Sequence, residues 1–385
     1  TRLGQAESTA ISRTAHVLLA DVLVNLGRYA EAAAILEQFK TGMDDGTARD
    51  LPMRSYAELV EGKLADKQGN LDQAIKIFAA VMDNKAYPGK IRDLGRLALA
   101  RAEIVREKNN PEQAEEETRA QPQEEEAPHT AGTAEERLLA FIGGKSESSL
   151  LMDAFNILLE EDIFRTNPQA LEKLTGWVNA RDAGRQPAAM YAMGSLLLAK
   201  DDLAGAVKMA EDGLSKYPQS LPVQTLSLNT ITTLLDKNRV EDAERLISKY
   251  PGTSPGLVFQ QGALAFRKGD YPLAQSLFRE AARRASEKTA ESALFNENLA
   301  ALNANDAAGA AALVKEAAGS AQLREHILFE QAHYAAKRMN PQAPELLASF
   351  VALATDPALK TQARLDQAEV ALNLNPPDLE TVQAI

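Results

Sequence analysis

The chain of 385 residues contains no cysteine, and this absence removes several kinds of chemistry at once. Without thiols the protein has no disulfides, no thiolate zinc site and no cysteine nucleophile. Histidine is also scarce, with four in the whole chain. No nucleophile elbow or glycine-rich catalytic loop accompanies them. We therefore assign no catalytic residue, no cofactor-binding residue, no cofactor and no metal ligand from the sequence.

An excess of positive charge and long apolar runs are missing as well. Lys and Arg number 42 against 54 Asp and Glu, which gives a formal net charge of −12. Phosphate contacts need clustered basic residues, so nucleic acid is not expected as a partner. The most apolar window, 187–199, is shorter than the 18 or so residues that cross a membrane. We therefore expect no transmembrane segment.

One stretch, 261–281, has the pattern of a complete helix–turn–helix hairpin. Gly262 lies within a first apolar helix, and Gly269 with the following Asp interrupts it. In the second helix, Ala274 and Phe278 fall on one face, together with a further alanine at 281. Small residues let two helices approach closely, while the aromatic residue fills the groove between neighbouring hairpins.

The same order of breaker, apolar residue and alanine recurs six times. The alanines are Ala32, Ala74, Ala206, Ala243, Ala274 and Ala310, and the breakers five residues earlier are Gly27, Gly69, Asp201, Asn238, Gly269 and Asn305. This pattern resembles the tetratricopeptide repeat (TPR), a 34-residue helix pair. The resemblance implies an all-α fold, a TPR-like α–α superhelix in which antiparallel helix pairs form a right-handed solenoid.

The quality of the match divides the chain into four predicted regions. Residues 1–108 form an N-terminal TPR-like array, and 109–136 an acidic, flexible linker with two Glu triplets. Residues 137–186 form degenerate helical repeats, and 187–385 a C-terminal TPR-like array with capping helices. The linker could instead attract a basic partner, but like charges in such runs usually repel one another and stay solvated.

A glycine-rich run, Gly143-Gly144-Lys145-Ser146, matches the last positions of a phosphate-binding loop motif. That loop would need a glycine where Leu139 stands, and a strand before it. The preceding residues have helical periodicity instead. We therefore interpret the two glycines as a helix end.

Three residues at helical spacing, His326, Glu330 and His333, share one face as metal ligands could. They do not follow the HExxH order, and no fourth ligand is evident nearby. A surface His–Glu pair is the favoured interpretation.

Two acidic pairs could serve a glycosidase, because that chemistry needs two carboxylates. They are Glu160-Glu161 and Asp201-Asp202. Both pairs occur where helix ends or turns are predicted, and solvated carboxylates are common there. An all-α glycan-active enzyme or small-ligand binder is therefore kept as the alternative function.

The resemblance implies that the first helix of each repeat lines a concave groove. The predicted partner-binding residues of this groove are Tyr191, Ser195, Asn229, Thr232, Phe259, Phe266, Arg267, Phe295 and Asn296. A mildly apolar stripe of this kind suits an amphipathic helix or an extended peptide. It could equally be core between repeats. The basic–Asn pair with which related repeats grip a C-terminal carboxylate is absent.

The favoured function is a non-enzymatic scaffold that binds a protein or peptide and helps assemble a larger complex. Self-association through the ends of the array is a further hypothesis. The chain begins at Thr1 without an initiator methionine, and its lack of cysteine permits an oxidising compartment. A periplasmic or bacterial cell-envelope location is expected, with the cytoplasm as the alternative. A segment of a longer polypeptide would show the same features.

Overall fold

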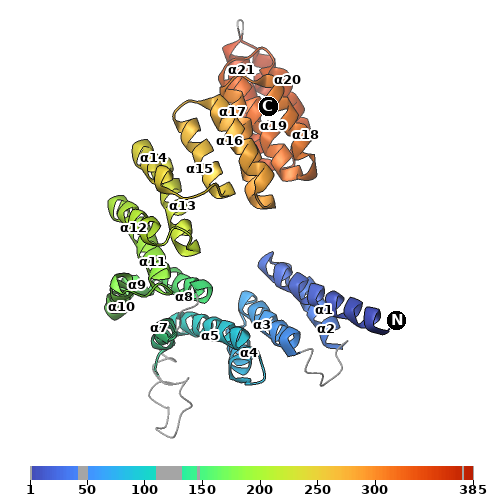
Figure 1. The fold of residues 1–385 in the computed structure, drawn as a ribbon. Helices are drawn as coiled ribbons and strands as arrows, with labels where there is room; N and C mark the ends of the chain where they lie inside the picture. The colour runs from blue at the N-terminus through green and yellow to red at the C-terminus, as the bar shows by residue number, and fades with distance from the viewer. Residues whose placement is uncertain (1, 42–50, 110–131, 145–147, 375–376, 385) are drawn as a thin grey trace. The chain divides into compact units, whose positions relative to one another are not determined.

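The computed structural model describes residues 2–41, 51–109, 132–144, 148–374 and 377–384 (Figure 1). These residues form α-helices and one short 3-10 helix, with no strand among them, so the all-α prediction is confirmed. Most of the predicted acidic linker lies outside the described residues. Two compact units can be distinguished, one up to Leu196 and one from Leu197. The four predicted region boundaries stay predictions.

Unit 1 consists of helices joined mostly by short turns. Its hairpins pair α1 with α2 and α3 with α4, and a larger core then joins α5 to the helices that follow. The bounds are α1 Arg2–Asn25, α2 Tyr29–Thr41, α3 Leu51–Lys67, α4 Leu71–Asp83, α5 Gly89–Asn109, α7 Ala134–Gly144, α8 Ser148–Glu160, α9 Ile163–Thr166, α10 Pro168–Asn179 and α11 Gln186–Ala199, whose last turn belongs to unit 2.

Unit 2 repeats one arrangement, in which each first helix packs on its own second helix and on the first helix of the next pair. The first helices are α13 Leu221–Asp236, α15 Pro255–Arg267, α17 Glu287–Asn303, α19 Ala321–Lys337 and α21 Pro357–Asn373. The second helices are α12 Leu203–Lys216, α14 Val240–Lys249, α16 Tyr271–Arg284, α18 Ala307–Glu316, α20 Ala343–Leu353 and α22 Leu379–Ala384, with the 3-10 helix η1 Ala317–Gly319 after α18.

The six predicted breakers all adopt the left-handed backbone conformation. Their φ angles are 75° at Gly27, 80° at Gly69, 61° at Asp201, 57° at Asn238, 78° at Gly269 and 58° at Asn305. Glycine enters this region without steric cost, and Asn and Asp tolerate it better than other residues. The sequence pattern missed two further turns of the same kind, at Asp162 with φ 57° and Met339 with φ 50°.

The alanines five residues after the breakers are all buried. Each is at most 3 % exposed, which lets the second helix lie close to the first. In unit 2, Asp202, Asp270 and Asp306 precede three of these second helices and accept a hydrogen bond from the backbone N–H three residues later. Such N-caps satisfy donors that have no partner inside the helix, so the turn both reverses the chain and begins the next helix.

Hydrogen bonds between neighbouring pairs reveal the repeat period directly. The Tyr56 hydroxyl donates to Asp21 across 35 residues, and the Arg245 guanidinium donates to Glu211 across 34. The Gln331 amide donates to an asparagine 33 residues earlier. Equivalent positions in successive helix pairs therefore face one another, as a period near 34 residues requires.

Candidate protein-binding surface

The first helices of unit 2 present most of the residues predicted to bind a partner. Asn229 and Thr232 on α13 and Arg267 at the end of α15 are exposed. Phe259, Phe266, Phe295 and Asn296 are half-buried. Tyr191 and Ser195 lie on the part of α11 that belongs to unit 1, so they are described separately.

The two phenylalanines of α15 are anchored on the neighbouring second helix. The Phe259 ring meets the buried Phe278 ring edge to face, with 5.3 Å between centroids and an interplanar angle of 62°. Phe266 meets Tyr271 in the same way, at 5.3 Å and 68°. Each ring therefore packs on the core and is also partly open to solvent, and the assignment of these residues to a partner-binding groove stays a prediction.

Phe295 on α17 has a similar double environment. It packs against a cluster that includes the buried Leu313 and Ile327, and its ring meets His326 edge-on at 6.4 Å. The Asn296 side-chain amide donates to the Ser292 carbonyl at 2.8 Å within the same helix. Its amide oxygen remains as an acceptor for a ligand.

Polar side chains next to these rings differ in whether they already form hydrogen bonds within the protein. The Thr232 hydroxyl donates to the Leu228 carbonyl at 2.9 Å and accepts from the Gln260 amide at 2.8 Å, which joins α13 to α15. The Asn229 amide and the Arg267 guanidinium have no side-chain partner among the described residues. These two groups can therefore bind a ligand without breaking an existing contact.

In unit 1 the predicted residue Tyr191 is already engaged. Its hydroxyl donates to the Asn156 side-chain oxygen at 2.9 Å. Burial raises the pKa of the Tyr191 phenol, so the hydroxyl stays protonated and able to donate. Ser195, four residues later on α11, is half-buried.

The histidines at metal-ligand spacing have other partners. His333 Nδ1 lies 2.6 Å from the carboxylate of Asp366, which is almost fully buried, and the His333 ring stacks on Phe329. His326 contacts Phe295 instead. Across the described part of the chain, no three potential ligands come together around a space for a metal ion.

Three of the four carboxylates in the acidic pairs hold the helix pairs in place. Glu161 accepts from Lys108 at 2.9 Å, and Asp201 from Lys237 at 2.7 Å. Asp202 caps α12 through the N–H of Gly205 at 2.9 Å. These contacts describe structural roles rather than two acids converging on a glycosidic bond.

The glycine-rich run ends a helix, as predicted, because α7 extends to Gly144. The lysine and serine that complete the motif lie outside the described residues. Among the helices that are described, each is either too short or too polar to span a bilayer.

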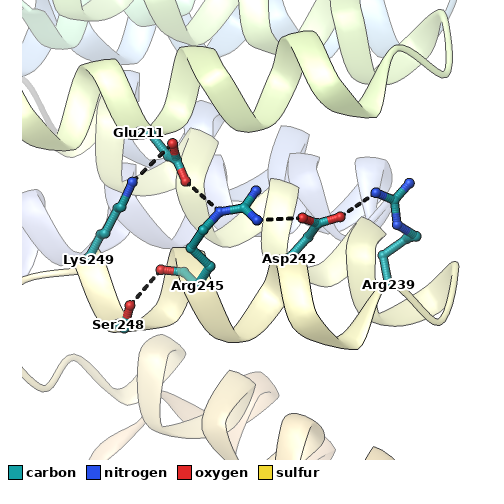
Figure 2. A network of polar contacts seen from close by, with 6 residues as sticks. All are labelled: Glu211, Arg239, Asp242, Arg245, Ser248 and Lys249. Atoms are coloured by element: carbon teal, nitrogen blue, oxygen red, sulfur yellow. Dashed lines mark hydrogen bonds and ion pairs between the residues drawn. The ribbon is translucent and has the colours of Figure 1, made fainter.

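Sequence reasoning missed a chain of alternating charges on the second helices (Figure 2). Glu211 on α12 accepts from Arg245 and Lys249 on α14, and Asp242 joins Arg245 to Arg239. Opposite charges one repeat period apart, such as Glu211 and Arg245, are a signal that could have found it.

A protein-family model described as "Tetratricopeptide repeat" matches residues 14–40. The matched segment contains the left-handed Gly27 and the buried Ala32, two elements of the pattern that recurs along the chain. The chain has the helix-pair fold of tetratricopeptide repeats, and the family match itself covers residues 14–40. A search of curated proteins finds no match to it.

Solved structures of other helical proteins align with this chain over most of its length. Yeast Tom70 is 12 % identical, with 96 % of this chain and 92 % of that chain covered and a TM-score of 0.35. The human IFIT1 dimer with m7Gppp-AAAA is 14 % identical, with 96 % and 84 % covered and a TM-score of 0.34. The P58(IPK) TPR domain is 13 % identical, with 97 % of each chain covered and a TM-score of 0.25. Because these identities and scores are low, these structures carry no argument about the role of this chain.

Proposed function

We propose that this protein is a non-enzymatic scaffold that binds a partner helix or extended peptide on the first helices of unit 2. One observation carries the proposal. On α13 and α15, the unpaired polar groups of Asn229 and Arg267 accompany the partly exposed ring of Phe259, and α17 adds the ring of Phe295. Aromatic anchors beside free hydrogen-bonding groups are what peptide-binding surfaces need.

The way the rings are held favours binding. Phe259 is fixed by its edge-on contact with Phe278, and Phe295 by its contact with His326. A side chain that is already immobilised loses little rotamer entropy when a partner covers it. The apolar area that a partner buries then contributes about 25 cal/mol per Å². The free amide and guanidinium would select among partners of similar hydrophobicity.

Site-specific photo-crosslinking tests which surface the partner touches. A photoreactive amino acid is placed at Thr232 or Arg267 on the proposed surface, and at Glu244 on the second helix α14 as a control. All three side chains are exposed. We expect the same crosslinked partner from the first two positions and none from the third. Equal crosslinking at all three positions would contradict the proposed surface.

A pair of variants separates binding from packing. Phe259→Ala with Phe295→Ala removes both rings, while the matched Phe259→Leu with Phe295→Leu keeps most of the apolar volume in the helix contacts. We expect the alanine variant to lose the partner and the leucine variant to retain part of the affinity, with the melting temperature of each recorded. Unchanged partner binding by the alanine variant would remove the aromatic groove from the proposal.

We propose that the scaffold works in assembly of a larger complex in the periplasm or cell envelope. The absence of cysteine supports this setting, because no thiol is exposed to oxidation. Fractionation of cells that produce the full-length natural protein tests the location. Recovery in the cytoplasmic fraction would overturn the envelope assignment while leaving the binding surface untouched.

Self-association is a second proposal, favoured by one face of α1. Leu18 and Val22 lie one helical turn apart on this face, Leu26 follows in the turn directly after the helix, and all three are exposed, Leu26 by 65 %. The residues in the same register of the next first helix are Val60 and Leu64, which are buried in the core shared with the preceding helix pair. The equivalent face of α3 is thus buried against another helix pair. We therefore propose that a second copy of the chain covers this face of α1.

Sedimentation velocity over a range of concentrations tests the self-association. Val22→Glu places a charge in the middle of the exposed face without touching the buried face of α1. We expect the wild type to form a dimer that this variant lacks. A wild type that stays monomeric at the highest concentration would contradict the proposal.

A further inference from the structure

A cavity of about 210 Å³ opens on the second helices of unit 2, between α12 and α14. The apolar residues that line it include the buried Val207 and Leu234 and the half-buried Leu203. Lys208, Arg239 and Arg245 are among the residues that line it. The cavity therefore combines a small apolar recess with several cationic groups.

The charges around this cavity are fixed by a network that spans two repeats (Figure 2). Arg245 Nε lies 3.1 Å from Glu211, and Arg245 Nη1 lies 2.8 Å from Asp242. Lys249 Nζ lies 3.0 Å from the other oxygen of Glu211, and Arg239 pairs with Asp242. Hydrogen bonds from Lys249 and Arg245 outweigh the effect of burial and lower the pKa of Glu211, so the network stays charged at neutral pH.

Positive charge exceeds negative charge at this place, although the whole chain carries −12. Two carboxylates, Glu211 and Asp242, hold the three cationic groups of Arg239, Arg245 and Lys249. A fourth cation, Lys208, has no partner among the described residues. Among the residues that line the cavity, Lys208, Arg239 and Arg245 face two carboxylates, so one positive charge is in excess there.

The arginines also keep free donors. A guanidinium has five N–H groups, and each arginine here uses only some of them. The side chains of Arg239 and Arg245 are 56 % and 51 % exposed, so their remaining N–H groups can reach a ligand. Because Asp242 contacts both, it holds the two guanidinium groups near one another without blocking them.

We propose that this cavity binds an acidic peptide segment of a partner protein. An apolar side chain of the peptide enters the recess at Val207 and Leu234, and carboxylates on either side of it meet Lys208 and Arg239. The volume decides between classes of ligand, because pockets for cofactors and drug-sized molecules measure roughly 300–1,000 Å³. A recess of about 210 Å³ has space for one side chain. The excess of positive charge around the recess indicates that the peptide residues next to this side chain are negatively charged.

The charged residues of this site lie on the second helices α12 and α14, whereas the surface proposed above lies on first helices, although Leu234 of the first helix α13 also lines the cavity. The protein could then hold two partners, or two parts of one partner, at the same time.

Fluorescence anisotropy with defined peptides tests the proposal on the intact chain. The probe is a labelled Glu-Glu-Leu-Glu-Glu peptide. The comparison peptides are Gln-Gln-Leu-Gln-Gln, which lacks the charge, and Glu-Glu-Ala-Glu-Glu, which lacks the large apolar group. We expect the glutamate–leucine peptide to bind most tightly, and its affinity to fall as salt is raised from about 50 mM, where charges are less screened.

Charge-reversal variants test whether the probe binds at this cavity. Lys208→Glu removes no contact within the protein. It should lower the affinity for the probe about threefold to fivefold, which is the effect of one exposed ion pair. Lys208→Glu with Arg239→Glu should weaken it at least about tenfold, as two such effects combined. The control, Lys216→Glu with Lys315→Glu, changes the net charge equally at exposed sites outside the cavity. It should leave the affinity unchanged.

Several outcomes would overturn the proposal. Equal weakening by the control would show a general charge effect, and equal binding of the glutamine peptide would exclude a role for the cations. Equal binding of the alanine peptide would exclude the recess. A single-stranded oligonucleotide of equal charge that bound as tightly as the peptide would exclude an acidic peptide as the specific ligand. None of these results changes the crosslinking expected at Thr232, so the two surfaces are tested separately.

Discussion

A methyl group added at Gly62 would lie 2.3 Å from a ring carbon of Phe78, so this glycine is what lets the aromatic ring pack on the first helix. The hairpin of α15 and α16 repeats the relationship, because a methyl group at Gly262 would lie 2.9 Å from the ring of Phe278. Both rings are almost fully buried, and both glycines precede their partners by 16 residues. A single interlocking contact thus fixes the distance between the two helices of the pair.

We predict that Gly62→Ala destabilises the protein. Overpacking costs about 1–3 kcal/mol, while alanine gains about 1 kcal/mol over glycine inside a helix, so the expected net loss is up to about 2 kcal/mol. Urea unfolding measures the change. The matched control is Gly176→Ala on α10, where nothing lies within 4 Å of the added methyl group. That variant should gain up to about 1 kcal/mol, and equal effects at both sites would contradict the packing argument.

The turn at Met339 offers a gain in stability. Met339 has φ 50°, a conformation that costs a residue with a side chain about 1–2 kcal/mol, and its side chain is exposed and contributes little packing. Glycine avoids the strain but loses about 0.5–1 kcal/mol through the greater freedom of the unfolded chain. We therefore expect Met339→Gly to stabilise the protein by up to about 1.5 kcal/mol, measured by chemical denaturation.

The reverse substitution checks the same reasoning. Gly269 has φ 78° at the equivalent turn, with nothing within 4 Å of an added methyl group. Gly269→Ala therefore tests the backbone alone, and it should destabilise by about 1 kcal/mol. Stabilisation by Gly269→Ala would refute the assigned turn conformation.

These turns also show what could be predicted from the sequence and what could not. Gly27 and Asn238 are residue types that favour a left-handed turn, so their recurrence five residues before an alanine was enough to place the hairpins. Met339 carries no such preference, and its turn forms because the packing of α19 and α20 overrides the local cost. Local preference therefore predicts the turn only where it agrees with the tertiary structure.

The binding surface was predictable only in part, for a different reason. Helical periodicity placed Phe259 and Phe295 on first helices, but it cannot show how much of each ring a neighbouring helix covers. Asn296 looked like a free polar group, yet its amide donates to the helix backbone. The network between Glu211 and Arg245 depends on how two hairpins stack, and only the structure shows that distance.

Two glutamates should give opposite pH dependences. Burial raises the pKa of Glu297 above 4.5, and only one of its carboxylate oxygens is bonded, by Arg279. Between 4.5 and that raised pKa the folded state binds more protons than the unfolded state, so this group favours folding more as the pH falls through that window. The stability of the wild type minus that of Glu297→Gln should therefore increase as the pH is lowered.

Glu325 provides the contrast. The hydroxyl and N–H of Thr355 and the N–H of Asp356 donate to its carboxylate and lower its pKa below 4.5. Its contribution is present above 4.5 and is lost as the pH falls through the lowered pKa. The stability of the wild type minus that of Glu325→Gln should therefore decrease with acidification. Denaturant titrations at several pH values measure both differences, and slopes of the same sign would contradict one of the two assignments.

Asp21 on α1 makes two contacts with the first helix α3, and we expect its hydrogen bond with Tyr56 to be stronger than its ion pair with Lys63. Asp21 accepts from the half-buried Tyr56 hydroxyl at 2.6 Å and from the more exposed Lys63 ammonium at 2.9 Å. A hydrogen bond to a charged group contributes about 1.5–3 kcal/mol, whereas an exposed ion pair contributes about 0.2–1 kcal/mol. Double-mutant cycles with Asp21→Ala, Tyr56→Phe and Lys63→Met measure the two coupling energies. We expect the Tyr56 coupling to be the larger and to persist in about 1 M salt, where screening should remove most of the Lys63 coupling. A Lys63 coupling that equals the Tyr56 coupling and resists salt would show that charge, rather than the buried hydroxyl, joins the first two repeats.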